Sequence, residues 1–314
     1  MSIAVRNLTK AYNGQPAVND ISFDVRTGEI LGFLGPNGAG KTTTMKIITC
    51  YMPPTSGTVE VDGLSIFDQS LAVRRKIGYL PEMNPLYLDM NVLEYLAYSA
   101  ELHGMRGGPA QTRLKEMVHV CGLESVRHKE IAELSKGFRQ RVGLAQAMIH
   151  DPEVLILDEP TSGLDPNQIV EIRNLIRQLG RAKTVILSTH ILSEVQATCN
   201  RVIIINDGKI VADGSPAHLQ RQFQGGEALT IELKTNSSDP LTDIAPKLRL
   251  VTSVNTASLL SHEGSDSRFE LAVDRGQDVR ESVFRLAVAE NWVVLEMHRR
   301  VTTLEEVFHK LTTT

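Results

Sequence analysis

The segment from Gly35 to Thr42 has the residue types and the spacing of a phosphate-binding loop. Its glycines let successive backbone N–H groups converge on an anion, and the helix predicted from about Thr43 adds the positive end of its dipole. In this pattern Lys41 reaches the β- and γ-phosphates of a nucleotide, and the Thr42 hydroxyl ligates Mg²⁺. We therefore predict a nucleotide site made by Gly35, Pro36, Asn37, Gly38, Ala39, Gly40, Lys41, Thr42 and Thr43.

Two adjacent carboxylates, Asp158 and Glu159, close the apolar run from Val154 to Leu157. If that run is a buried strand of a parallel sheet, its carboxyl end is where ligands of such sheets bind. We expect Asp158 to hold Mg²⁺ through its water shell, and Glu159 to orient and deprotonate the water that attacks the γ-phosphate. The alternative is an acidic pair that only faces solvent, and the phosphate loop upstream disfavours it.

Apolar segments of two kinds indicate which elements position these residues. Compact apolar runs alternate with helical patterns, as expected for strands buried in a parallel sheet. These runs cover residues 30–34, 154–157, 184–188 and 202–205. Shorter β-favouring pieces punctuated by turn residues predict a small antiparallel sheet beside the nucleotide. They cover residues 2–8, 21–25 and 58–61. The predicted fold class is therefore α/β.

One predicted helix begins at Pro166, with Asp165 as its N-terminal cap. Its apolar stripe should pack on the sheet. The stripe consists of Ile169, Ile172, Ile176 and Leu179. A second helix opens at Ser135, which is its predicted cap, within the string Leu134-Ser135-Lys136-Gly137-Phe138-Arg139-Gln140-Arg141.

The order of these motifs along residues 2–222 resembles the ATP-binding cassette (ABC) transporter ATPases. The motifs are the phosphate loop, the Leu-Ser-x-Gly segment at 134–137, the Asp-Glu strand end, Ser162-Gly163-Leu164-Asp165 and Ser188-Thr189-His190. The resemblance implies a P-loop NTPase fold with a mixed sheet core, an antiparallel β subdomain and a helical subdomain at about residues 83–134. It also implies a nucleotide-binding domain over residues 1–224 that binds and hydrolyses ATP.

The same resemblance implies a head-to-tail dimer of two ATP-binding subunits. Ser135 and Gly137 of one subunit would meet the γ-phosphate bound to the other subunit's loop, and Asp165 would link the two sites. His190 would contact the γ-phosphate and the attacking water, and Tyr12 lies where the family stacks an aromatic ring on adenine. Because the nucleotide lies between the subunits, its state would set the state of the dimer.

Three residues in two motifs depart from the family pattern. Lys136 and Phe138 replace the commoner glycine and glutamine, although the residues with phosphate-facing roles remain. Glu82 replaces the usual glutamine that touches Mg²⁺ and signals to the membrane subunit. A carboxylate can still ligate the metal, but it adds negative charge near the triphosphate.

The helical insert contains a predicted capping pair, Asn91 and Glu94, and helices that stop at Gly104 and Gly122. The first apolar stripe is predicted to be Leu93, Leu96, Ala97 and Ala100, and the second Leu114, Met117, Val118 and Cys121. In the resembled family this region receives membrane-spanning permease subunits. We predict Pro85-Leu86-Tyr87-Leu88 as the docking surface, which would place the chain at the cytoplasmic face of the inner membrane.

A second, smaller domain is predicted over residues 225–314, after the hairpin signal Asn206-Asp207-Gly208-Lys209 and a boundary near Gly225-Gly226. Its expected order βαββαβ is that of a ferredoxin-like α+β domain. The expected segments are strand 228–234, helix 241–248, strands 251–260 and 268–273, helix 278–289 and strand 292–297. Thr302 and Glu305 predict a capping box for a last helix. We interpret this domain as a dimer-stabilising or regulatory appendage.

The composition bounds the function. The chain has 314 residues, 42% of them hydrophobic and 22% charged, with a net charge of −4, so nucleic acid is not an expected partner. Cys50, Cys121 and Cys199 are widely spaced without metal-ligand neighbours, which predicts reduced structural thiols. We expect neither a signal peptide nor a membrane-spanning segment.

Three classes of function remain open from the sequence. Transport is favoured because the motifs and the tail at 303–312 resemble exporter-type cassettes, and residues 84–90, 135–141 and 165–171 resemble the ATP-binding subunit associated with bacterial gliding motility. The second class is a cassette ATPase that acts on nucleic acid or the ribosome, against which stand the absence of a long heptad insertion and of a basic stripe. The third is a nonhydrolysing nucleotide switch, which would not need Glu159 and His190.

Overall fold

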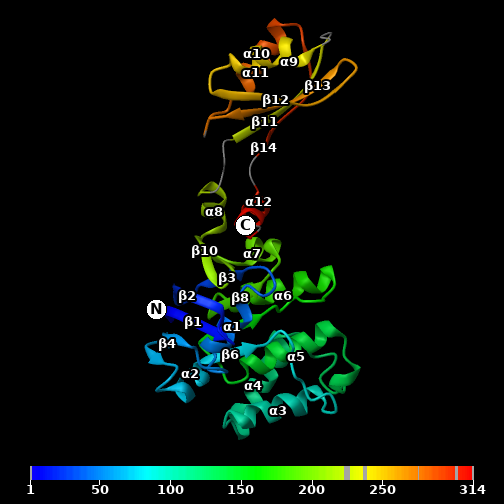
Figure 1. Ribbon diagram of the computed structural model, residues 1–314. Helices are drawn as coiled ribbons and strands as arrows, with labels where there is room; N and C mark the ends of the chain where they lie inside the picture. Colours follow the sequence, from blue (N-terminus) through cyan, green and yellow to red (C-terminus); the bar gives the residue numbers. More distant parts are fainter. Residues whose placement is uncertain (1, 223–226, 236–238, 275, 301–302, 313–314) are drawn as a thin grey trace. The chain divides into compact units, whose positions relative to one another are not determined.

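The computed structural model describes residues 2–222, 227–235, 239–274, 276–300 and 303–312, which divide into two compact units (Figure 1). The first unit comprises residues 1–216 together with 310–314, and the second comprises residues 217–309. The boundary predicted near Gly225 lies outside the described residues. Within the described part of the chain, no helix is long and apolar enough to cross a lipid bilayer.

A six-stranded mixed sheet forms the centre of the first unit, with the order β10-β9-β3-β8-β7-β6. Only the β9–β10 hairpin is antiparallel. The strands are β3 (Ile30–Leu34), β6 (Ile77–Leu80), β7 (Val154–Asp158), β8 (Thr184–Thr189), β9 (Arg201–Asn206) and β10 (Lys209–Gly214). Strands β3, β7 and β8 are buried along their whole length, which explains their continuous apolar sequences. The predicted buried strands are confirmed, and so is the hairpin predicted at Asn206-Asp207-Gly208-Lys209, which joins β9 to β10, while β6 was not predicted.

A four-stranded antiparallel sheet, in the order β2-β1-β4-β5, confirms the second predicted sheet. Its strands are β1 (Ile3–Tyr12), β2 (Gln15–Val25), β4 (Ser56–Val61) and β5 (Leu64–Ser65). Helix α1 (Lys41–Ile48) joins both sheets, because its Met45, Ile47 and Ile48 belong to one apolar core with residues of β1, β2 and β4 and of β3, β7, β8 and β9. This shared core fixes the start of α1, where the phosphate loop ends.

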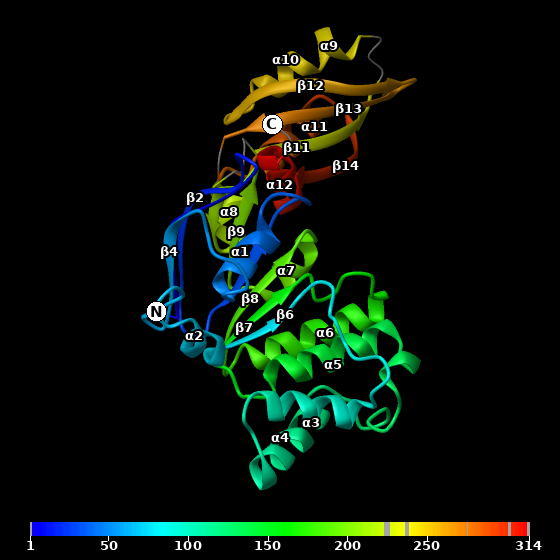
Figure 2. The ribbon, with the colours of Figure 1, turned by 60° about the horizontal axis from the view of Figure 1, so that its bottom comes forward.

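Helices α3 (Val92–Leu102), α4 (Gly107–Val120) and α5 (Lys136–Met148) contact one another and group together in both views of the ribbon (Figures 1 and 2). The capping box of Asn91 and Glu94 is confirmed, with Glu94 N donating to Asn91 Oδ1 over 2.9 Å. The predicted stripe of α3 is partly wrong. Leu93 is half-buried and Ala97 is exposed, because the helix turns Val92, Tyr95, Leu96, Ser99 and Ala100 toward α4 and α5.

The remaining elements of the first unit are α2 (Ser70–Lys76), the short 3₁₀ helix at Ile131–Glu133, α6 (Pro166–Leu179) and α7 (Leu192–Thr198); α8 (Pro216–Gln222) follows β10. Asp165 caps α6 as predicted, since Gln168 N donates to its Oδ1 over 2.9 Å. The cysteines are free thiols, and burial raises the pKa of Cys121 and of Cys199 to about 12, as expected for structural thiols.

The second unit has the predicted order βαββαβ and a four-stranded antiparallel sheet, β12-β13-β11-β14. Helices α10 and α11 share its apolar core with the strands. The elements are β11 (Glu227–Lys234), α9 (Pro240–Asp243), α10 (Ala245–Arg249), β12 (Val254–Glu263), β13 (Asp266–Val273), α11 (Arg280–Ala289) and β14 (Val293–Arg300). This is the ferredoxin-like arrangement.

The last helix, α12 (Leu304–Thr312), begins differently from the prediction. Its reciprocal capping pair is Thr303 and Glu306, with Glu306 N donating to Thr303 Oγ1 and Thr303 N to Glu306 Oε2, both over 3.2 Å. Thr302, the predicted cap, lies outside the described residues. Two consecutive threonines each have an acidic residue three positions later, so the sequence pattern could not distinguish them.

Candidate functional site

The loop between β3 and α1 holds its backbone in a conformation that requires glycine at defined positions. Gly38 and Gly40 have φ values of 83° and 105°, in the left-handed region that favours glycine. A Cβ on Gly40 would collide with the carbonyl oxygen of Ala17, and one on Gly35 would collide with that of Ile205. The glycines therefore allow both the tight turn of the loop and its close packing against the backbone of neighbouring segments.

Lys41 is buried at the first position of α1, with 6% of its side chain exposed. Its Nζ donates to the carbonyl oxygens of Gly35 and Pro36 over 2.8 and 3.1 Å. It also lies 3.4 Å from Oε1 of Glu159, which is equally buried. The ammonium group is thus held at the mouth of the loop by groups that an anion could replace.

Glu159 lies directly beyond the carboxyl end of β7, with a left-handed φ of 49°. Its N–H donates to Ser188 O over 3.1 Å and to Ser188 Oγ over 3.2 Å, which ties the end of β7 to β8. Its Oε2 lies 2.9 Å from Nδ1 of His190, whose side chain is 46% exposed. The carboxylate therefore lies between a buried cation and a solvent-facing imidazole.

Asp158 is fully buried at the last position of β7. Its Oδ1 accepts a hydrogen bond from the Ser188 hydroxyl. No hydrogen bond to Oδ2 is formed by the residues that the structure describes. Burial raises the pKa of this carboxyl above its usual range, although the hydroxyls of Ser188 and Thr42 oppose the rise.

One cavity of about 360 Å³ brings together most of the predicted phosphate-facing residues. The lining residues are Asn37, Gly38, Gly40, Lys41, Thr42, Thr43, Glu82, Glu159, Ser162 and His190. Sequence reasoning did not assign Ser162 to the site, although it had singled out the segment that contains it. The predicted alternative, an acidic pair facing only solvent, does not describe Glu159, which is 5% exposed within this cavity.

Four predicted site residues, Ser135, Gly137, Asp165 and Tyr12, belong to segments other than the phosphate loop and the end of β7, and they do not line the cavity. Ser135 caps α5, where its Oγ accepts from Phe138 N over 3.4 Å, and Gly137 lies against the side chain of Gln168. Asp165 caps α6. Tyr12 is 45% exposed at the end of β1, and its hydroxyl lies 3.1 Å from Met52 Sδ. Ser135, Gly137 and Asp165, which are expected to act across a subunit interface, therefore do not line this cavity, and neither does Tyr12, which is expected to stack on adenine.

Glu194 is a buried carboxylate that sequence reasoning missed. It is 1% exposed on α7, and it accepts hydrogen bonds from the hydroxyls of Thr161 and Thr189, the latter over 2.8 Å. It thereby joins the segment after β7 to the end of β8, immediately before His190. The sequence held one signal: Glu194 and the buried Thr198 are four residues apart, on one face of the helix.

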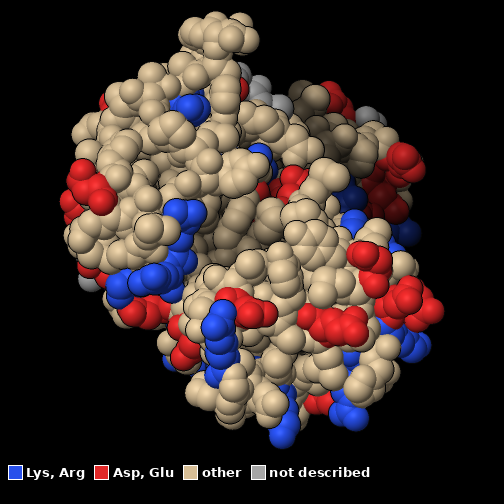
Figure 3. All heavy atoms as spheres, turned by 90° about the horizontal axis from the view of Figure 1, so that it is seen from below, with Lys and Arg blue, Asp and Glu red and all other residues tan. Residues whose placement is uncertain are grey.

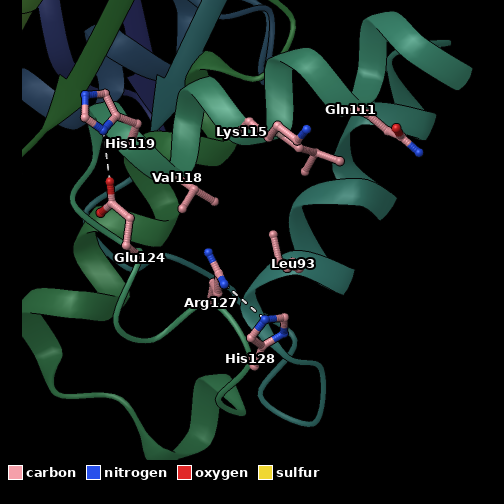
Figure 4. A pocket seen from close by; sticks show the side chains of 9 residues that line it. Leu93, Gln111, Lys115, Val118, His119, Glu124, Arg127 and His128 are labelled. Carbon is pink, nitrogen blue, oxygen red and sulfur yellow. Dashed lines mark hydrogen bonds and ion pairs between the residues drawn. The ribbon is translucent and has the colours of Figure 1, made fainter.

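A separate pocket of about 460 Å³ lies among α3, α4 and residues 124–128 (Figure 4). Leu93 and Val118 contribute apolar surface to it, and the view shows His119 paired with Glu124. None of the predicted nucleotide-site residues lines this pocket. Pocket volume alone therefore does not identify the nucleotide site. The site is identified by the polar groups that converge in the cavity lined by Lys41, Glu159 and His190.

Comparisons with known proteins agree with this geometry. The model of the family described as "ABC transporter" matches residues 18–162. The bacitracin transport ATP-binding protein BcrA of Bacillus licheniformis is 37% identical over 222 residues, which cover 70% of this chain and 72% of that protein. The Nod factor export ATP-binding protein I of Burkholderia orbicola is 35% identical over 235 residues, which cover 74% of this chain and 77% of that protein.

A solved structure extends the likeness to three dimensions. The post-hydrolysis dimer of the ATP-binding cassette MJ0796, bound to ADP and Pi, aligns with a TM-score of 0.62 and 28% identity over 68% of this chain and 98% of that one. This chain therefore belongs to the ABC transporter family, as an ATP-binding subunit that hydrolyses ATP.

Proposed function

We propose that this chain works as half of a head-to-tail homodimer and drives export through separate membrane-spanning subunits. One observation carries the proposal: Lys41, Glu159 and His190 line one cavity, while Ser135 and Gly137 lie outside its lining. A γ-phosphate in the cavity would therefore receive these last contacts from a second copy. Ser135 is exposed, so its hydroxyl and the N-terminus of α5 are accessible to that copy.

Within the cavity the roles follow from the contacts. Lys41 would exchange its carbonyl and carboxylate partners for the β- and γ-phosphates, which frees the Glu159 carboxylate to accept a proton from water. His190 holds the other carboxylate oxygen, so Glu159 can keep its direction when Lys41 leaves. Asp165 would link the two sites of the dimer, and Tyr12 would stack on adenine.

Mg²⁺ fits the residues present. Asp158 Oδ2 is buried without a hydrogen bond from a described residue, and the Thr42 hydroxyl interacts with the same carboxyl group. A hard cation prefers such oxygen ligands. Thr42, Asp158 and Glu82 would hold it. When bound, the ion would neutralise negative charge on the phosphate oxygens. It would also favour the ionised form of Asp158, whose pKa burial raises.

The proposed permease contact is the segment Pro85 to Leu88, on the cytoplasmic face of the membrane. Tyr87 and Leu88 are 52% and 47% exposed. The Tyr87 ring lies 5.9 Å from that of Tyr95 and 5.7 Å from that of Tyr98, so it is a supported aromatic surface rather than a loose side chain. Exposed aromatic groups of this kind are common anchors at protein interfaces.

Export, rather than action on nucleic acid, is supported by the relatives' names and by the charge distribution. Figure 3 shows acidic side chains beside basic ones on the face it presents. The gliding-motility lineage is also part of this proposal, and it rests on the strings at 84–90, 135–141 and 165–171. The permease that co-purifies with the chain from detergent would identify the lineage, whereas hydrolysis stimulated by DNA or ribosomes would favour the other function.

The dimer is tested with Glu159→Gln, which keeps the shape of the side chain but removes the base. With saturating MgATP this variant should sediment as a dimer, and without nucleotide as a single chain. Lys41→Ala in the same background should stay single because it loses its phosphate contacts. A Glu159→Gln chain that stays single while saturated with nucleotide would refute the proposal.

The docking surface is tested by Tyr87→Glu, with Tyr51→Glu as the matched control. Tyr51 is 72% exposed and lies in another segment of the chain. We expect Tyr87→Glu to lose the co-purifying membrane subunit while the control keeps it. Equal recovery of the permease with both variants would exclude this segment as the contact.

A further inference from the structure

Lys136 occupies an electrostatically unfavourable position. It is exposed at the first residue of α5, where the positive end of the helix dipole disfavours a cation. The first turn of α5 contains no acidic residue. Lys136 forms neither an ion pair nor a hydrogen bond with any residue that the structure describes. Its charge is therefore not compensated by its own helix or by another carboxylate.

The ammonium group of Lys136 rests instead on the backbone of Gly163. A Cβ on Gly163 would collide with Lys136 Nζ and would lie 3.3 Å from its Cε. Gly163 also has a left-handed φ of 68°, which favours glycine there, whereas the end of the exposed Lys136 side chain could move aside for a Cβ. The next residue of α5 packs closely on a different residue, because a Cβ on Gly137 would lie 2.7 Å from Cδ of Gln168.

Gly163, which Lys136 contacts, is connected through a short segment of chain to the proposed catalytic base, Glu159. Gly163 follows Ser162, which lines the nucleotide cavity. Ser162 N donates to the carbonyl oxygen of Glu159 over 3.1 Å. A displacement of Gly163 would therefore pass through one residue and one hydrogen bond to the backbone of Glu159. That backbone has a left-handed φ of 49°, so its conformation depends on such contacts.

We propose that Lys136 is a positioning residue that makes hydrolysis at one site depend on nucleotide at the other. This inference rests on the proposed dimer, in which Ser135 and Gly137 face the partner's triphosphate. Without that triphosphate, Lys136 lies on Gly163. When the partner's triphosphate binds beside Ser135, its negative charge attracts the ammonium group and Lys136 leaves Gly163. The segment from Ser162 to Asp165 can then move and place the Glu159 carboxylate in its catalytic position.

The test compares Lys136→Met, which keeps the length but removes the charge, with Lys136→Arg, which keeps the charge. Lys115→Met is the matched control, because Lys115 is an exposed lysine on α4 outside the nucleotide cavity. The readouts are the Hill coefficient of ATP hydrolysis and the Kd for ATP. With two coupled sites, the unaltered chain, Lys136→Arg and Lys115→Met should give a Hill coefficient approaching about 2. Lys136→Met should give about 1, and its Kd for ATP should rise by about two- to fivefold, as expected for the loss of one exposed attraction to the triphosphate.

Dimer formation is measured separately in the Glu159→Gln background. If Glu159→Gln chains fail to pair with MgATP, the proposed dimer fails and this inference fails with it. If they pair both with and without Lys136→Met, and Lys136→Met keeps the cooperativity of the unaltered chain, only the role of Lys136 is refuted. If Lys136→Met abolishes hydrolysis while pairing persists, recovery with Lys136→Arg supports the inference, and failure to recover refutes it.

Discussion

Replacement of Glu159 by glutamine tests the chemistry of the site most directly. The amide has nearly the same shape as the carboxylate, so the backbone conformation and the hydrogen bonds from its N–H to Ser188 should persist. What changes is the capacity to accept a proton from water, and such a base contributes about 10²- to 10⁴-fold in rate. We therefore expect kcat for ATP hydrolysis to fall by about that factor.

The same substitution should not weaken ATP binding. In the absence of nucleotide, Glu159 Oε1 lies 3.4 Å from Lys41 Nζ, and at an effective dielectric constant of about 20 this corresponds to a gross attraction of about 5 kcal/mol. Most of it is offset by the desolvation of two buried charges, which leaves a net of about 1 kcal/mol. The triphosphate competes with Glu159 for Lys41. Because Glu159→Gln removes the negative charge of this competitor, the substitution should tighten ATP binding by about fivefold.

The assay measures phosphate release in steady state and nucleotide affinity by equilibrium binding. Glu153→Gln is the matched control, since Glu153 carries the same carboxylate but is 63% exposed in an ion pair with Lys76, outside the cavity. It should leave both quantities unchanged. A Glu159→Gln chain that hydrolyses ATP within threefold of the unaltered chain would remove Glu159 from the role of base. A tenfold loss of affinity would contradict the proposed competition for Lys41.

Three other side chains of the cassette have contributions that substitution can measure. Lys41→Ala removes charge-assisted contacts worth about 1.5 to 3 kcal/mol each, so ATP affinity should fall by at least about tenfold, and normal affinity would contradict the loop assignment. Ser188→Ala removes the hydroxyl that donates to Asp158 and accepts from Glu159 N, so the free energy of unfolding should fall by about 1 to 3 kcal/mol, as urea titration will measure. Burial lowers the pKa of His150 to about 4, whereas the unfolded value is about 6.5, so the unfolded chain binds more protons between these values and stability is lost as pH falls through this window. His150→Gln should reduce this loss of unfolding free energy by about 1 to 2 kcal/mol, a figure that allows for the partial exposure of His150. If the unfolding free energies at pH 7 and pH 5 differ as much in the variant as in the unaltered chain, this role of His150 is refuted.

The phosphate loop and the capping pairs could be predicted because their information is local. The residues from Gly35 to Thr42 are contiguous, and the turn they make depends mainly on glycine at fixed positions. Asn91 with Glu94 forms the same reciprocal bonds wherever a helix begins with that spacing. The apolar run of β3 matched the observed strand from Ile30 to Leu34, since a strand buried on both faces has no polar residue to obscure its ends.

The supports of the site could not be predicted because they join segments that are distant in sequence. Ser188 meets Asp158 and Glu159 only because β7 and β8 are neighbours in the sheet, in a register that pairs Asp158 with Ser188. Glu194 meets Thr161 for the same reason, across 33 positions of sequence. A serine in a strand and a glutamate in a short helix have no local pattern that marks them, so their partners are defined by the tertiary fold alone.

The conformation of Glu159 shows most clearly why local propensity is insufficient at such a site. A left-handed φ of 49° in a residue other than glycine costs about 1 kcal/mol or more, and nothing in the apolar run before it predicts that the strand ends in this way. The hydrogen bonds from its N–H to both oxygens of Ser188 compensate for this cost. The turn also places the side chain between Lys41 and His190 instead of continuing the alternation of the strand. The residue type was readable from the sequence, but its direction, on which the proposed chemistry depends, is set by the neighbouring strand.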